Sequence, residues 1–115
     1  MRPDALLLQD ILEATDEVIG TLPATRAQYD ADKLVRSHLV RNIQIIGEAA
    51  SRVSESLKAQ HPHVPWRAIA GMRHAIVHDY FEIDWDEVYS TAANDVPALR
   101  PQIEAILASL PPEQP

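Results

Sequence analysis

The chain has 115 residues, a length typical of one domain, and a formal net charge of −7. It contains no cysteine, which excludes disulfide bonds and thiolate metal sites. No apolar run approaches the roughly 20 residues that span a bilayer, and the apolar stretch that follows Asp4 is too short for a secretory signal. We therefore expect a soluble, cytoplasmic protein that does not bind membranes.

The charge is unevenly distributed along the chain. Residues 1–32 hold two Lys/Arg and seven Asp/Glu, and residues 80–115 hold one and seven. Residues 33–79 hold seven Lys/Arg, three Asp/Glu and all five histidines. The acidic net charge alone disfavours nucleic acid as a partner, and the acidic ends are also compatible with ordinary solvated surfaces. The pattern indicates that a phosphate-binding site, if there is one, lies in the middle segment.

Apolar residues at helical spacing predict the first two helices. The first covers about 4–21, and its apolar stripe is Leu7, Ile11, Ala14 and Val18. Residues 21–25, around Pro23, should end it. Asp30 is a candidate N-cap for a second helix over about 31–60. That helix carries a 4-3-4-3-4 seam, expected to be core, of Leu39, Ile43, Ile46, Ala50, Val53 and Leu57.

A connector at 61–65 separates these helices from a third. Pro65 suits the first turn of a helix over about 65–80, and residues 81–84 should then form a short turn. The pattern favours no strand, because no alternation of Val, Ile and Thr occurs.

Asp84 and Glu87 resemble a capping box that opens a fourth helix. Its apolar stripe is Trp85, Val88, Ala92, Val96, Leu99, Ile103, Ile106 and Leu110. Pro97 and Pro101 each remove a backbone donor, so we expect a kink or break near 95–97. The prediction is an all-α, up-and-down bundle of four to five helices, with one domain over 1–110 and a disordered tail at 111–115.

The segment Gly71-Met-Arg-His-Ala-Ile-Val-His-Asp-Tyr-Phe81 concentrates the chemistry-bearing side chains. On a continuous helix, His74 and His78 would share a face, a spacing that can also hold zinc. A catalytic zinc would need a third ligand, which the motif does not supply, so we expect no metal. Two satisfied structural histidines are the other alternative.

On the same helix Arg73 and Tyr80 would share a face, since they are seven residues apart. Arg73 and His78 are five apart, which separates them by roughly 140° around an ideal helix. One helix therefore does not direct both at one phosphate. A second copy of the segment from another subunit could complete the site, which weakly indicates a composite site in a dimer.

The motif Arg73-(four residues)-His78-(one residue)-Tyr80, with the polar residue His74 after the arginine, resembles the signature of HepT-type toxins of the HEPN superfamily. Further stretches resemble that family in the same order. They are Arg41-Asn-Ile-Gln-Ile-Ile-Gly-Glu-Ala-Ala50, Val64-Pro-Trp-Arg67, Ile69-Ala-Gly-Met-Arg73 and Asn94-Asp-Val-Pro97. The resemblance covers about residues 5–108.

This resemblance implies a homodimeric, metal-independent endoribonuclease toxin that needs no cofactor. The motif helices of two subunits would line one cleft, and a nucleotidyltransferase antitoxin would neutralise the toxin. Carried over, His78 is the general acid/base, Arg73 binds the phosphate and His74 assists. Tyr80 contacts the substrate or receives AMP from the antitoxin.

The residues fit this chemistry. Histidine titrates near neutral pH and can take a proton from a ribose 2′-OH, and arginine offers a planar cation to phosphate oxygens. The role of Asp79, which is acidic beside His78, stays open. Two alternatives also stay open: a non-catalytic HEPN module that binds nucleotide or RNA for a partner nucleotidyltransferase, and a purely structural dimeric bundle.

Overall fold

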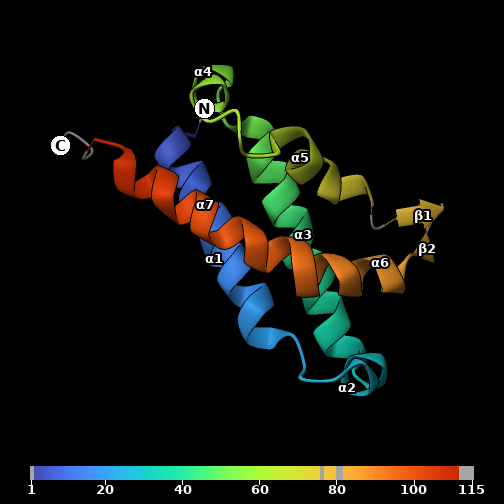
Figure 1. Cartoon of the computed structure of the whole chain (residues 1–115). Coiled ribbons are helices and arrows are strands. Elements are labelled where there is room, and N and C mark those ends of the chain that lie inside the picture. Colours follow the sequence, from blue (N-terminus) through green and yellow to red (C-terminus); the bar gives the residue numbers. More distant parts are fainter. Residues whose placement is uncertain (1, 76, 80–81, 112–115) are drawn as a thin grey trace.

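The computed structural model describes residues 2–75, 77–79 and 82–111, and for residues 75 and 77–79 it describes the backbone only. The elements follow in the order α1 (Asp4–Thr21), α2 (Arg26–Ala31), α3 (Lys33–Arg52), α4 (Glu55–Gln60), α5 (Trp66–Ala75), β1 (Val77–Asp79), β2 (Glu82–Ile83), α6 (Trp85–Ser90), the π-helix η1 (Thr91–Asp95) and α7 (Val96–Ser109). The predicted all-α helical fold is confirmed (Figure 1). None of the described helices is both long and apolar enough to cross a membrane.

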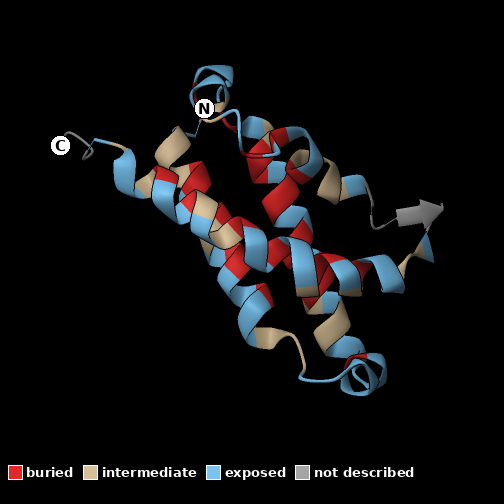
Figure 2. Ribbon diagram, viewed as in Figure 1, coloured by how far each residue is buried: buried red, intermediate tan, exposed pale blue. Residues whose placement is uncertain are grey.

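The long helix α3 lies at the centre of the bundle. It packs against α1 on one side and α5 on another, and α7 packs against α1 (Figure 1). Every residue of the predicted seam from Leu39 to Leu57 is buried, as are Leu7, Ile11, Ala14 and Val18 of α1. The buried faces of these helices turn toward one another (Figure 2). Helical periodicity therefore predicts the core correctly, because only one face of each helix is apolar.

The segment predicted as the second helix consists of more than one helix, because polar side chains within it cap new helix starts. Asp32, rather than Asp30, caps α3, because its carboxylate accepts a hydrogen bond from the Val35 amide. Asp30 lies inside the separate helix α2. At the other end α3 stops at Arg52, and Ser54 caps α4. The prediction of one helix over 31–60 is wrong at both places.

The third predicted helix is also shorter than expected. Helix α5 ends at Ala75, and Val77–Asp79 forms strand β1, which pairs antiparallel with β2. The predictions of a helix to residue 80 and of a chain without strands are wrong here, and part of the predicted turn at 81–84 is strand β2. The segment after Ala75 is rich in β-branched and aromatic residues, which prefer extended backbone.

The expected discontinuity before Pro97 is present as the π-helix η1. The Val96 amide donates to the carbonyl of Thr91, five residues earlier, and α7 then begins with Pro97 in its first turn. Proline lacks the amide that a regular α-helix needs, and a π-turn absorbs the loss without stopping the helix. Asp84 caps α6 by accepting a hydrogen bond from the Glu87 amide, which is one half of the predicted capping box.

Candidate active site

The site is built where α3 and α5 approach most closely, at Gly47 and Arg73. A Cβ atom on Gly47 would lie 2.6 Å from the Arg73 amide nitrogen and 3.2 Å from the carbonyl oxygen of Ala70. Real Cβ atoms do not approach backbone atoms so closely, so only glycine permits this packing. The backbone contact fixes the position along α3 from which the Arg73 side chain extends.

Side chains of α3 then orient the Arg73 guanidinium. Its Nη1 donates to the hydroxyl of Ser51 at 2.7 Å and to Glu48 Oε2 at 3.2 Å. Arg73 Nε donates to His74 Nε2 at 3.1 Å, which requires an unprotonated nitrogen there and therefore this tautomer of the neutral imidazole. Arg73 and His74 stand in the last turn of α5, where the helix dipole favours positive charge.

Glu48 connects two arginines across this surface. Its carboxylate pairs with Arg52 at 3.0 Å and with Arg73 at 3.2 Å. Hydrogen bonds from Arg52 and then from Arg73 hold the pKa of Glu48 below its ordinary value, so the carboxylate stays ionised. An ionised Glu48 holds Arg73 beside α3 and leaves that arginine only partly neutralised.

Arg73 and His74 border a cavity of about 450 Å³. The other residues that line it come from α3 and are Arg41, Gln44, Ile45 and Glu48. Arg41 is exposed and forms no ion pair among the residues that the structure describes. The cavity thus combines two arginines, one histidine and one carboxylate, a balance that attracts an anion.

His78 and Asp79 lie on strand β1, and their side chains are outside the described part of the chain, as is the whole of Tyr80. Because α5 ends at Ala75, His74 and His78 do not share a helix face. The predicted common helix face of Arg73 and Tyr80 involves a residue outside the described part of the chain. The 140° separation of Arg73 from His78 does not apply either, since a hairpin rather than a helix carries the histidine.

The base of the hairpin is fixed by a buried tyrosine from another helix. The Tyr29 hydroxyl on α2 donates to the carbonyl of Trp85 at 2.7 Å, at the point where the chain leaves β2 and enters α6. Burial raises the pKa of Tyr29 to about 12, although Arg26 and Arg36 act in the opposite direction. A protonated Tyr29 thus holds one end of the segment that carries His78.

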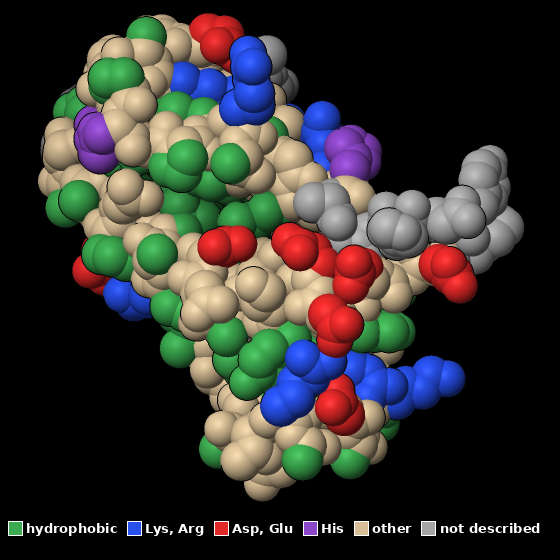
Figure 3. Space-filling model, turned by 45° about the vertical axis from the view of Figure 1, so that its right-hand side comes forward, with side chains coloured by type: hydrophobic (Ala, Val, Ile, Leu, Met, Phe, Trp, Pro, Cys, Tyr) green, Lys and Arg blue, Asp and Glu red, His purple; other side chains and the backbone are tan. Residues whose placement is uncertain are grey.

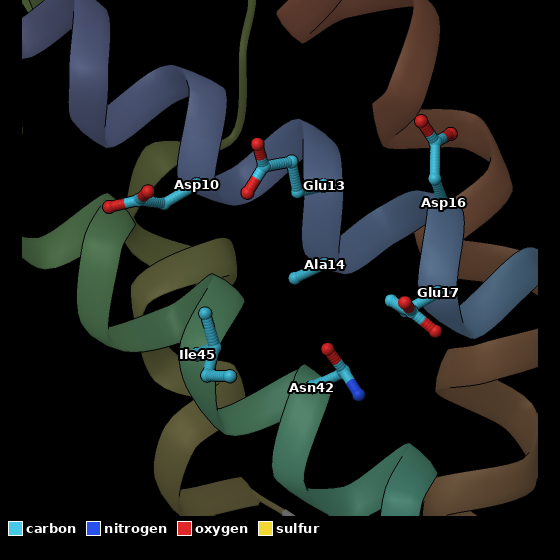
Figure 4. A pocket seen from close by; sticks show the side chains of 7 residues that line it. All are labelled: Asp10, Glu13, Ala14, Asp16, Glu17, Asn42 and Ile45. Carbon is cyan, nitrogen blue, oxygen red and sulfur yellow. The ribbon is translucent and has the colours of Figure 1, made fainter.

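A larger cavity, of about 650 Å³, lies between α1 and α3 and contains none of the predicted site residues (Figure 4). Its walls carry the carboxylates of Asp10, Glu13, Asp16 and Glu17. These carboxylates would repel a phosphate group, whereas the smaller cavity beside Arg73 is lined by two arginines. Within the described residues, no three His, Asp or Glu side chains are grouped so that they could hold a metal ion.

The predictions from sequence missed the residues of α3 that position Arg73, namely Gly47, Glu48 and Ser51. One signal was present. Gly47 interrupts a helix of otherwise strong apolar pattern, and an isolated glycine in that setting often marks a close approach of two backbones. The partners of Glu48 and Ser51 could not be read in this way, because Arg73 lies more than twenty residues away in the sequence.

Comparison with known proteins points to one family. Residues 11–106 match the family model described as Ribonuclease HepT-like. The chain is 31% identical to a protein of Methanocaldococcus jannaschii that is provisionally named an RNase, over 90% of this chain and 86% of that protein. It is 32% identical to a protein of Thermococcus cleftensis provisionally named ribonuclease HepT, over 86% of this chain and 91% of that protein. No solved structure gives a significant match.

Proposed function

The chain belongs to the HepT-like ribonuclease family, and from this premise we propose that it is an endoribonuclease that cleaves RNA at the cavity beside Arg73. One observation carries the proposal. Three contacts, from Ser51, Glu48 and His74, hold the Arg73 guanidinium at the edge of a cavity that also contains Arg41. The one carboxylate that pairs with Arg73, Glu48, also pairs with Arg52, so Arg73 keeps part of its positive charge beside the cavity.

The reaction that fits these residues uses the substrate's own 2′-OH as nucleophile. His78 takes the 2′-OH proton, the 2′ oxygen forms a bond to phosphorus, and the bond from phosphorus to the 5′ oxygen breaks. The departing 5′ oxygen takes up the proton that His78 removed, so His78 returns to its starting state and the products are a 2′,3′-cyclic phosphate and a free 5′-OH. Arg73 stabilises the charge on the phosphorane, and no metal ion enters the scheme.

Arg73 is suited to its role because part of its guanidinium stays available. The contacts within the described residues use Nε and Nη1, which leaves the N–H groups of Nη2 for a phosphate oxygen. His74 is exposed beside Arg73 and would assist by orienting the guanidinium or by contacting a neighbouring phosphate.

We further propose that two copies of the chain assemble the working site. The helical angle that first indicated a composite site no longer supports it, so the proposal rests on the family resemblance and on one surface feature. Ile45 lies in the wall of the cavity and is 38% exposed, although it is a large apolar side chain. A second subunit that covers Ile45 would close the cavity beside Arg73.

The proposed biological role is that of a toxin neutralised by a nucleotidyltransferase antitoxin. Transfer of AMP from ATP to the Tyr80 hydroxyl, with release of pyrophosphate, would add an anionic phosphate and bulk to the motif that carries Arg73 and His78, and so hinder binding of RNA. Of the other two tyrosines, Tyr29 is fully buried and could not accept AMP in the folded chain. The purified pair incubated with ATP should therefore add AMP to the wild-type chain and not to Tyr80→Phe.

RNA cleavage by the purified chain tests the central proposal. We expect cleavage of a single-stranded RNA, no cleavage of the same sequence as DNA, and little effect of EDTA. Arg73→Ala and His78→Ala should each lower the rate by about a hundredfold or more and keep the wild-type circular dichroism spectrum. RNA that binds but stays intact would instead support the non-catalytic binding module. Dependence of cleavage on a divalent ion would contradict the proposed role of His78.

A further inference from the structure

Helix α5 borders a second hollow besides the cavity beside Arg73. It packs against α3, while Ala68, Ile69 and Met72 of α5, with Pro65 just before the helix, line a separate groove of about 300 Å³. The far wall of this groove comes from α6, η1 and α7. Met72 and Arg73 are adjacent in sequence yet open onto different hollows, so α5 separates the groove from the proposed site.

The groove has an apolar floor and low walls. Ile69 and Leu99 form the floor and are 2% and 3% exposed, and small, exposed side chains, Ala68 and Ala98, stand on opposite walls. Figure 3 shows hydrophobic side chains along this hollow, which lies between α5 on one side and α6, η1 and α7 on the other. Such a slot between two helices accepts the apolar side of a third, and its volume suits the anchoring side chains of about one or two turns.

The edge of the groove is acidic. Glu87 and Asp95 line it, both are exposed, and neither forms an ion pair among the described residues. Acidic side chains follow the lower edge of the hollow in Figure 3. No Lys or Arg from the described part of the chain lines this groove. An occupant would therefore gain from positive charge, and RNA is excluded by its own phosphates.

From this combination we propose that the groove between α5 and α7 is a docking site for a cationic amphipathic helix of a protein partner. Apolar side chains of that helix lie on Ile69 and Leu99, and its Lys or Arg side chains pair with Glu87 and Asp95. The small side chains of Ala68 and Ala98 let its backbone come close.

Docking there also regulates the site, and this consequence rests on the proposed function. The two walls of the groove, α5 and α6, are joined in sequence by the hairpin that carries His78. A helix that enters the groove sets the spacing of these walls and so moves one end of the hairpin relative to Arg73. The partner thereby changes the rate of RNA cleavage without contacting the cleft.

Binding of a synthetic peptide tests the docking site on the full chain. The probe is a fluorescent Leu/Lys amphipathic helix of about four turns, and the matched peptide carries Glu in place of Lys. Ala98→Trp fills the groove, and Ala108→Trp adds the same bulk at another exposed alanine of α7. The double variant Glu87→Gln, Asp95→Asn removes the negative charge at the edge of the groove. As its control, Glu13→Gln removes an exposed carboxylate of the cavity between α1 and α3.

We expect the Leu/Lys peptide to bind the wild type, Ala108→Trp and Glu13→Gln alike. Binding should weaken at least about tenfold for Ala98→Trp and for the double variant, and the Leu/Glu peptide should bind no better than those variants. Equal binding to Ala98→Trp, equal binding of both peptides, or no binding to the wild type would each overturn the proposal.

The link to the hairpin is read from the NMR signal of the His78 ring, which should shift when the peptide is added. An unchanged signal would overturn the regulatory part of the proposal. These measurements do not depend on catalysis. If the wild type bound the peptide but left RNA intact, the proposed function would fail while the docking site stood.

Discussion

Gly47 of α3 and Arg73 of α5 are in backbone contact, since a Cβ on the glycine would lie 2.6 Å from the arginine amide nitrogen. Backbone packing alone therefore fixes the position of Arg73, the residue that binds phosphate in the proposed reaction, independently of its side-chain contacts. Ser51 stands one helical turn along the same face of α3 and completes the support through the guanidinium. The geometry of the site is a consequence of how closely two helices pack.

Gly47→Ala should therefore reduce activity strongly, although the substitution adds only one methyl group. The added methyl group forces α5 away from α3 at Arg73, which we expect to cost about 1–3 kcal/mol of stability and to lower RNA cleavage by about tenfold or more. Thermal unfolding and cleavage kinetics measure both effects.

Gly71→Ala is the matched control, because Gly71 is on the neighbouring helix and a Cβ there meets nothing within 4 Å. Removing a helical glycine should raise stability by up to about 1 kcal/mol and leave cleavage unchanged. A fully active Gly47→Ala would show that the Gly47–Arg73 approach does not position the site.

Ser51→Ala should loosen Arg73 without unfolding the chain. The substitution removes the 2.7 Å hydrogen bond to Nη1, and a hydrogen bond to a charged group contributes about 1.5–3 kcal/mol. Because water can partly replace the hydroxyl, we expect kcat/KM for RNA to fall about tenfold. Ser37→Ala, at an exposed serine of the same helix, should have no effect. Equal activity of the two variants would mean that Ser51 contributes nothing to the site.

Helical periodicity predicted the buried faces from Leu7 to Ile106 because each helix has one apolar side. Helix ends were predicted less well, since they depend on which of several nearby polar residues finds a free amide. Asp30 and Asp32 are equally good caps by residue type, and only the packing of α2 decides between them. The end of α5 at Ala75 was also predicted wrongly. There the β preference of the following residues outweighs the pattern that favoured a helix.

The motif residues could be proposed from sequence because their types and spacing carry chemistry. The residues that hold Arg73 in place, Glu48 and Ser51, could not be predicted. Their contacts with Arg73 join distant segments and depend on how α3 and α5 pack. The three-dimensional relation of Arg73 to His78 was predicted wrongly from helical geometry. A one-dimensional spacing gives an angle only while the helix continues, and here it stops two residues after Arg73.

Tyr29 predicts how stability depends on alkaline pH. Burial raises the pKa of Tyr29 from its ordinary value of 10.0 to about 12, so the folded chain holds this proton more tightly than the unfolded chain. The resulting stabilisation is complete below pH 10 and is lost as the pH rises from about 10 to about 12. Chemical denaturation at a series of pH values should show this decline.

Tyr29→Phe should remove that part of the decline and also lower stability at neutral pH by about 1 kcal/mol, because the carbonyl of Trp85 loses its donor. Tyr89→Phe, whose ring contacts Tyr29 edge to face, serves as the control and should retain the decline. An identical pH dependence in Tyr29→Phe and the wild type would show that this hydroxyl is not the responsible group.

Complementation between two inactive variants gives the sharpest test of the composite dimer site. Arg73→Ala and His78→Ala homodimers should each be inactive, because every site lacks one of the two groups. If Arg73 of one subunit acts with His78 of the other, unfolding and refolding them together yields heterodimers with one intact site and one doubly defective site. Random association makes about half of the dimers mixed, so activity should return to about a quarter of the wild-type value.

Two controls set the baseline: each variant refolded alone, and a mixture combined without unfolding. A refolded mixture that stays inactive, although mass spectrometry shows mixed dimers, would contradict the shared site. It is the result expected of a site within one subunit, because each subunit of the mixed dimer then lacks one of the two groups.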